Sequence, residues 1–171
     1  MTHADALDVK CADFLKDNHR AYAHKARRKR IALVSVEVTS HHSSEVRLLV
    51  GSSQLVAGGN SFPAETRAII LRKLSAFTWD FLIYLIIDFH PVTAAIEAFL
   101  FLTGPIYNWR LKRHLRLLSD GELSLRPGES AKLVLGFRGV PKKAQELEEL
   151  ELCYRCGDGE KQAVRCEFVP A

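Results

Sequence analysis

The sequence lacks the short motifs that would identify a reaction directly. It contains no glycine-rich phosphate loop, no nucleophile elbow, no HExxH zinc motif and no paired-carboxylate motif. We therefore predict no catalytic residue and no cofactor, and an enzyme is the least favoured class of function. An enzyme would need a pocket around Asp88, His90 and Glu97, where two acids flank a histidine.

The first ten residues, MTHADALDVK, also lack the apolar run of a secretory signal peptide. This pattern fits a cytosolic protein, and it fits equally an exported protein whose leader has been removed. The sequence therefore leaves the compartment open.

A strong net charge is absent as well, because the formal charge is only +4 over 171 residues. The positive charge is concentrated in two segments: residues 1–30 carry eight Lys/Arg and four Asp, and residues 72–118 carry six Lys/Arg and three acids. A nucleic-acid-binding protein would show a basic stripe within a recognisable module. Nucleic acid is thus an unlikely partner, and the basic flanks fit an anionic membrane surface at least as well.

Alternating apolar and polar residues dominate the rest of the chain. The stretches "IALVSVEVTS" (31–40) and "EVRLLVG" (45–51) show this pattern, and "GELSLRPGESAKLVLGF" (121–137) reads as strand, Pro-Gly turn and strand. Two further strands, "LEELELCYRC" and "QAVRCEFVP", follow near the C-terminus. About eight short strands separated by turn residues are typical of a β-sandwich.

The strand–"RPGES"–strand unit and the alternating "LEELELCY" strand resemble those of bacterial immunoglobulin-like domains of envelope proteins and lipoproteins. The resemblance covers about residues 31–60 and 121–168. It implies an antiparallel, Greek-key immunoglobulin-like β-sandwich that is interrupted between its two halves. No functional residue transfers with it, because such sandwiches carry many different roles.

The predicted fold is therefore mainly β with helical additions. At the N-terminus, Leu7, Cys11 and Phe14 recur at helical spacing and predict an amphipathic helix. The "SFPAETRAIILRKL" stretch (61–74) is assigned to a strand. Four segments result: an N-terminal helix (1–30), the first half of the sandwich (31–74), an apolar helical-hairpin insertion with a basic amphipathic helix (75–119), and the second half of the sandwich (120–171).

The insertion contains the most apolar part of the chain. Pro91 divides it into two predicted helices, 77–89 and 92–104, and the Gly104-Pro105 pair is expected to end the second. The "IYNWRLKRHLRLL" stretch (106–118) then predicts a basic amphipathic helix.

A membrane span across this segment is disfavoured. A transmembrane helix needs about 20 largely apolar residues, and a single span would have to accept Asp80, Asp88, Glu97 and Pro91. Two interpretations therefore lead. The hairpin lies at a membrane surface, or it packs against the sandwich, the N-terminal helix or a second copy of the chain.

The leading functional hypothesis is a non-enzymatic accessory or scaffold protein that docks on a membrane surface or in a larger assembly. Its localisation would be membrane-associated, at the cytoplasmic face or in the envelope. The predicted docking residues are Trp79, Phe81, Tyr84, Phe99, Phe101, Tyr107 and Trp109. The predicted anionic-surface residues are Arg110, Lys112, Arg113 and Arg116. The alternative is a module that binds a lipid or another apolar small ligand, with the hairpin as a lid.

Three C-terminal cysteines deserve a metal-site test. Cys153, Cys156 and Cys166 have the spacing C-x2-C-x9-C, which is similar to a retroviral-type zinc knuckle. The histidine of that knuckle falls on Lys161, which is not a zinc ligand. We therefore predict no metal site.

A β-hairpin explains these cysteines more simply. A six-residue loop at residues 157–162 would place Cys153 opposite Cys166, where a disulfide could form in an oxidising compartment. Cys11 and Cys156 would then be left over.

Overall fold

The computed structural model describes residues 7–17, 20–75, 91–141 and 147–168, and it describes only the backbone of residues 17, 20–22 and 91–102. The chain divides into two compact units. We call Met1–Ile70 with Leu117–Ala171 the sheet unit, and Leu71–Arg116 the helical unit.

The sheet unit is mainly antiparallel β structure. Its described strands are β1 (Leu7–Asp13), β2 (Ile31–Ser40), β3 (Val46–Leu49), β4 (Gln54–Ala57), β5 (Asn60–Pro63), β6 (Glu122–Leu125), β7 (Ser130–Arg138), β8 (Leu147–Cys156) and β9 (Lys161–Glu167). It also holds helices α1 (Phe14–Asp17) and α2 (Arg20–Arg28) and the short 3-10 helix η2 (Val50–Ser52). Helix α3 (Arg67–Leu74) crosses into the helical unit, which contains α5 (Pro91–His114).

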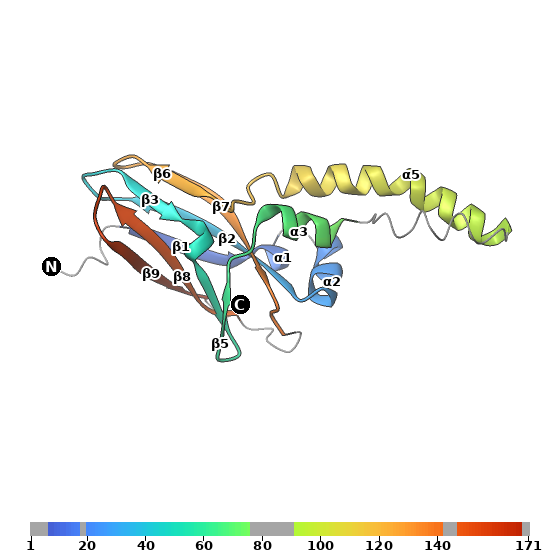
Figure 1. The fold of residues 1–171 in the computed structure, drawn as a ribbon, viewed down its shortest axis with the longest axis horizontal. Coiled ribbons are helices and arrows are strands. Elements are labelled where there is room, and N and C mark those ends of the chain that lie inside the picture. The colour runs from blue at the N-terminus through green and yellow to red at the C-terminus, as the bar shows by residue number, and fades with distance from the viewer. Residues whose placement is uncertain (1–6, 18–19, 76–90, 142–146, 169–171) are drawn as a thin grey trace. The chain divides into compact units, whose positions relative to one another are not determined.

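The strands form two sheets, seen on the strand-rich side of Figure 1. The first sheet has the order β1-β2-β7. In the second sheet, the long strand β8 is central: β9 pairs with one of its edges, and β4 and β3 pair with different parts of its other edge. Strand β5 then pairs with β4, and β6 pairs with β3. Every one of these strand pairs is antiparallel.

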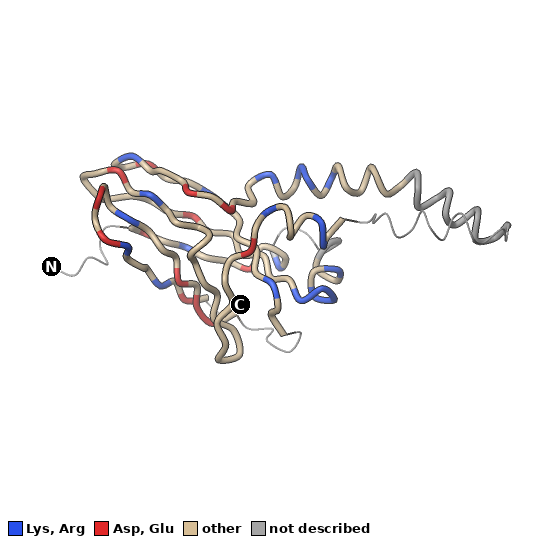
Figure 2. Tube along the Cα trace, in the orientation of Figure 1, with Lys and Arg blue, Asp and Glu red and all other residues tan. Residues whose placement is uncertain are grey.

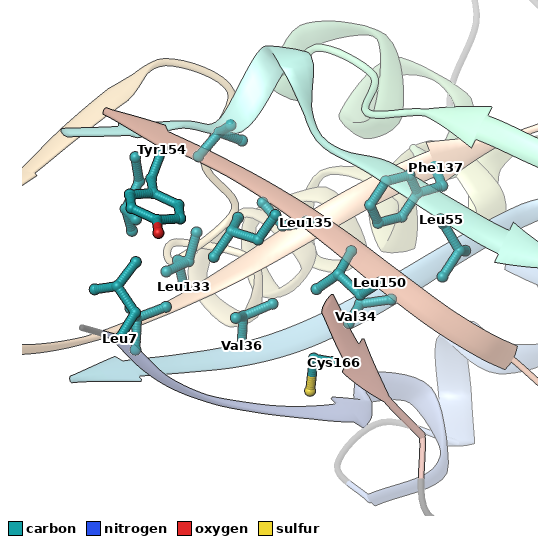
Figure 3. Packing of buried hydrophobic residues seen from close by; sticks show 14 of the residues in the cluster. Leu7, Val34, Val36, Leu55, Leu133, Leu135, Phe137, Leu150, Tyr154 and Cys166 are labelled. Atoms are coloured by element: carbon teal, nitrogen blue, oxygen red, sulfur yellow. The ribbon is translucent and has the colours of Figure 1, made fainter. Parts of the chain in front are cut away.

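Side chains from both sheets meet in one hydrophobic core (Figure 3). Because successive side chains on a strand point to opposite faces, alternate residues of each strand enter this core. The main contributors are Val34, Val36 and Val38 of β2, Leu133, Leu135 and Phe137 of β7, Leu48 of β3, Leu55 of β4, and Leu150, Leu152 and Tyr154 of β8. The predicted alternation on these strands is confirmed.

The first sheet is also buried on its other face. Ile31 and Leu33 of β2 are buried there, and helices α1 and α2 contact the same strand. On β7, Ile70 of helix α3 approaches the backbone of Gly136. Burial on both faces explains why β2 and β7 carry nearly continuous apolar runs.

Gly136 permits this close approach of helix and strand. A Cβ atom on Gly136 would lie 2.7 Å from Cγ1 of Ile70 and 3.0 Å from its Cδ1, and Ile70 is fully buried. We expect Gly136→Ala to lower the free energy of unfolding by about 1–3 kcal/mol, as overpacking in a filled core does. Urea unfolding measures this change.

Gly121→Ala is the matched control, because a Cβ at Gly121 meets no atom within 4 Å. Ile70→Ala should cost less free energy in the Gly136→Ala background than in the wild type, since it removes the clashing atoms. Equal costs in the two backgrounds would contradict the predicted clash.

A disulfide between Cys11 and Cys166 joins the two sheets at one edge. Cys11 lies on β1, the edge strand of the first sheet, and Cys166 lies on β9, the edge strand of the second. Their Cα atoms are 6.3 Å apart across 155 positions of sequence. The predicted partner of Cys166 was Cys153, and that pairing is wrong: β9 begins at Lys161, so Cys153 lies opposite Ala163 and Cys166 opposite Leu150.

The predicted N-terminal helix (1–30) is wrong for residues 7–13, which form β1. Leu7 and Cys11 are four residues apart, which fits a helix, but they also share the parity of a strand face with Val9. The pairing of β1 with β2, from Leu7 opposite Ser40 to Asp13 opposite Val34, decides between the two patterns. Helical structure begins only at Phe14.

The predicted strand over residues 61–74 is wrong in its second half. Strand β5 ends at Pro63, and helix α3 begins at Arg67. Ile70 and Leu74 lie one helical turn apart and are both fully buried. Burial of this helical face overrides the strand preference of the β-branched pair Ile69-Ile70.

The predicted helix end at Gly104-Pro105 is also wrong, because α5 continues through Pro105 to His114. A proline inside a helix removes one backbone hydrogen bond and costs about 3 kcal/mol. The residues that follow offset this cost, since Leu111 and Leu115 bury the same helical face. The predicted helix over 77–89, and with it the hairpin, lies outside the described residues.

Candidate anionic-surface site on helices α3 and α5

The C-terminal half of α5 exposes large apolar side chains beside cations. Ile106 is 55% exposed and Trp109 is 59% exposed, although most apolar residues of their size are buried in the described parts of the chain. Arg110 and Arg113 are exposed as well. Because these four positions are related by steps of three, four and seven, they share one face of the helix.

Arg113 and Trp109 are in direct contact on this face. The guanidinium carbon of Arg113 lies 5.5 Å from the centre of the Trp109 ring, which is within cation–π range. A stacked guanidinium keeps its N–H groups available for an anion. The pair therefore presents an amphipathic aromatic ring and a cation together.

The opposite face of α5 is buried. Leu111 and Leu115, which the sequence placed on one apolar face, are almost completely inaccessible to solvent. Tyr107 is half-buried, and its hydroxyl donates a hydrogen bond of 3.3 Å to the carbonyl oxygen of Leu74 at the end of α3. This contact fixes α5 against the last turn of α3.

A pocket of about 250 Å³ lies between these two helices. It is lined by Leu71, Arg72, Ser75, Asn108, Leu111 and Lys112. The Ser75 hydroxyl donates to the carbonyl oxygen of Arg72 at 2.8 Å. The pocket thus combines two cations with an apolar floor.

The predicted docking residues differ in whether the structure describes them and in how exposed they are. Trp79, Phe81 and Tyr84 lie outside the described residues, and Phe99 and Phe101 lie on α5 where side chains are not described. Tyr107 faces α3, as given above, and only Trp109 is both described and well exposed.

All four predicted anionic-surface cations, Arg110, Lys112, Arg113 and Arg116, are exposed. Arg110, Lys112 and Arg113 lie on the C-terminal half of α5 and Arg116 lies just beyond its end, and Figure 2 shows basic positions in blue along this part of the chain. The structure brings Arg110 and Arg113 together with Trp109, and it places Lys112 at the pocket instead. Within the described parts of the chain, no helix is long and apolar enough to cross a membrane.

Sequence reasoning missed four pocket residues: Leu71, Arg72, Ser75 and Asn108. Assigning residues 61–74 to a strand concealed the fact that Arg72 lies in the last turn of a helix. The four-residue spacing of the apolar residues Ile70 and Leu74 was a usable signal for a helix. In the structure the Ile70 N–H donates to the carbonyl oxygen of Thr66 at 3.1 Å, at the start of this helix.

The cysteines considered as metal ligands are not brought together. Cys166 is held in the disulfide with Cys11, and the Cys153 thiol donates to the carbonyl oxygen of Ser52 at 3.2 Å. Burial raises the pKa of the Cys156 thiol, which therefore favours the protonated form that binds metals poorly. Across the described residues no group of three potential ligands is placed to hold a metal ion.

The residues considered for an enzyme pocket are not among those whose side chains the structure describes. Asp88 and His90 lie outside the described residues, and the Glu97 side chain is not described.

Comparison with models of known protein families finds no match, and no curated protein matches the sequence either.

Proposed function

We propose that this chain is a non-enzymatic accessory protein that docks on an anionic membrane surface through the exposed face of α5. The observation that carries the proposal is the grouping of exposed Ile106 and Trp109 with Arg110 and Arg113. Tryptophan suits the level of lipid headgroups because its ring is apolar and its N–H is polar. Nearby arginines add attraction to anionic lipids.

The alternative, a module that binds a lipid or apolar ligand between the sheets, has less support. Val34, Leu48, Leu55, Leu135 and Leu150 pack into the shared core and are fully buried. An apolar ligand in that space would have to displace these side chains, at the cost of close packing. The proposal therefore assigns binding to the surface of α5.

The proposal includes an immunoglobulin-like fold of the bacterial envelope type and an extracytoplasmic location. The core shared by two antiparallel sheets supports the first part. The Cys11–Cys166 disulfide supports the second, because disulfides persist in oxidising compartments and are rare in the cytosol. Of the two predicted locations, the envelope is thus preferred over the cytoplasmic face.

Vesicle sedimentation tests the docking proposal. We expect the protein to bind vesicles of phosphatidylcholine mixed with phosphatidylglycerol at low salt, and to bind less as salt increases. Arg110→Gln with Arg113→Gln should weaken binding about 30-fold, since each cation near such a surface contributes about 1 kcal/mol. Ile106→Ser with Trp109→Ser should weaken binding at least about tenfold.

Matched variants elsewhere serve as controls. Arg126→Gln with Lys132→Gln removes the same charge from exposed positions of the sheet unit, and Leu117→Ser removes a 41% exposed apolar side chain outside α5. Both should bind vesicles as the wild type does. Absence of wild-type binding at low salt, or equal losses in the control and α5 variants, would overturn the proposal.

A further inference from the structure

The pocket between α3 and α5 is separate from the docking face. Asn108, Leu111 and Lys112 line it, and these positions lie on another side of α5 from Ile106 and Trp109. The docking proposal therefore leaves the pocket without a role.

The charges of the pocket favour an anion. Arg72 and Lys112 both line a volume of about 250 Å³, and among the described residues that line it there is no carboxylate to neutralise them. Two like charges around a small space repel each other, and a bound anion would remove that repulsion. The pocket at the β6–β7 turn differs, because Glu45 and Glu129 line it together with Arg126.

The lining side chains fit a phosphate group, because two cations around one small space match a dianion better than a singly charged carboxylate. A planar guanidinium such as that of Arg72 matches two oxygens of a phosphate, and the ammonium of Lys112 supplies a second charge from α5. The side-chain amide of Asn108 adds polar lining, while Leu71 and Leu111 form an apolar floor. The volume is below the roughly 300–1,000 Å³ of ordinary small-molecule sites, so it suits a single headgroup-sized moiety.

The pocket has a fixed shape because its two walls are tied together. The Tyr107 hydroxyl bonds to the carbonyl oxygen of Leu74, and the Ser75 amide and hydroxyl bond to the carbonyl oxygens of Leu71 and Arg72 at 2.8 Å each. Leu111, which lines the pocket, and Leu74, which accepts the bond from Tyr107, are both buried. A preformed site of this kind loses little entropy on binding.

We propose that this pocket binds a phosphate monoester, with Arg72 and Lys112 as the residues that hold the phosphate. The group would come from a lipid headgroup with a terminal phosphate, such as phosphatidic acid, or from a soluble phosphate. Both sources offer the same dianionic oxygens to the two cations.

Titration with inorganic phosphate, followed by calorimetry and by the shift in melting temperature, tests the shared chemistry. We expect Arg72→Gln with Lys112→Gln to weaken phosphate binding at least about tenfold. Asn108→Leu places a larger, apolar side chain in the pocket without changing its charge, and it should weaken phosphate binding too. Circular dichroism checks that both variants fold. Arg126→Gln with Lys132→Gln is the charge-matched control and should bind phosphate as the wild type does.

Vesicles distinguish the two sources. If phosphatidic acid binds more tightly than phosphatidylglycerol at matched charge, and the pocket variant loses only this preference, the group is a lipid headgroup. If inorganic phosphate binds through the pocket without any preference between the lipids, the source is soluble. Phosphate binding that is absent from the wild type, or equal in the wild type and the pocket variant, would overturn the inference.

The failure of this inference is distinguishable from failure of the docking proposal. Arg110→Gln with Arg113→Gln should lose binding to phosphatidylglycerol vesicles and keep binding to inorganic phosphate. In the wild type, absence of vesicle binding alone counts against docking, and absence of phosphate binding alone counts against the pocket.

Discussion

Removal of the Cys11–Cys166 disulfide is expected to lower the free energy of unfolding of the sheet unit by about 3–5 kcal/mol. The crosslink joins positions 155 residues apart, and the entropy it removes from the unfolded chain grows with the length of the closed loop. It also ties β1 to β9, two strands that belong to different sheets and sit at their edges. Loss of the crosslink therefore acts on both the unfolded and the folded chain.

Urea unfolding with and without a reducing agent measures this change, and Cys11→Ser with Cys166→Ser repeats it without the reagent. Cys156→Ser is the matched control, because Cys156 is a free, half-buried cysteine on the neighbouring strand β8. The control should keep its sensitivity to reduction, whereas the double variant should have none. An unchanged urea midpoint on reduction would show that the disulfide contributes no stability.

The pairing of these cysteines could not be predicted from spacing. Four cysteines allow several pairings, and the sequence does not choose between them. Estimating the β8–β9 loop as residues 157–162 shifted the register of the hairpin and suggested Cys153 as the partner of Cys166. The true partner lies on β1, which the sequence assigned to a helix, so the error in β1 and the error in pairing are connected.

The β-rich core was accessible to sequence reasoning, because β2, β7 and β8 are nine or ten residues long and each places alternate apolar residues in the core. The secondary structure of short segments, and of segments that fit two periodicities, could not be predicted in this way. Leu7 and Cys11 fit two periodicities, and only pairing with β2 distinguishes them. Helix α5 continues past Pro105 because distant packing of Leu111 and Leu115 outweighs a local signal.

The residues of the candidate site also differ in whether a local sequence pattern could predict them. The exposure of Trp109 with Arg110 and Arg113 follows from a local helical pattern, and the sequence was sufficient to name these residues. The pocket depends on the contact of two helices that are separated by 16 residues of sequence, between Leu74 and Pro91. Arg72 therefore acquires a role only when α3 is recognised as a helix and placed against α5.

The second large effect is expected at Phe137 on β7. This side chain is the largest of those that are fully buried, and it lies where the core meets the end of β5. Its paired neighbours are Ala32 on β2 and Ala64 beyond β5, and each carries only a methyl group. Neither neighbour can occupy the volume that a smaller residue at position 137 would leave.

We therefore expect Phe137→Ala to lower the free energy of unfolding by about 3–5 kcal/mol, because it creates a cavity that the surrounding strands do not close. Phe137→Leu should cost less than about 1.5 kcal/mol, since it retains most of the volume. Phe62→Ala is the control, because Phe62 lies on β5 and is only half-buried. Urea unfolding measures all three, and equal losses at positions 62 and 137 would show that Phe137 does not support the contact between the two sheets.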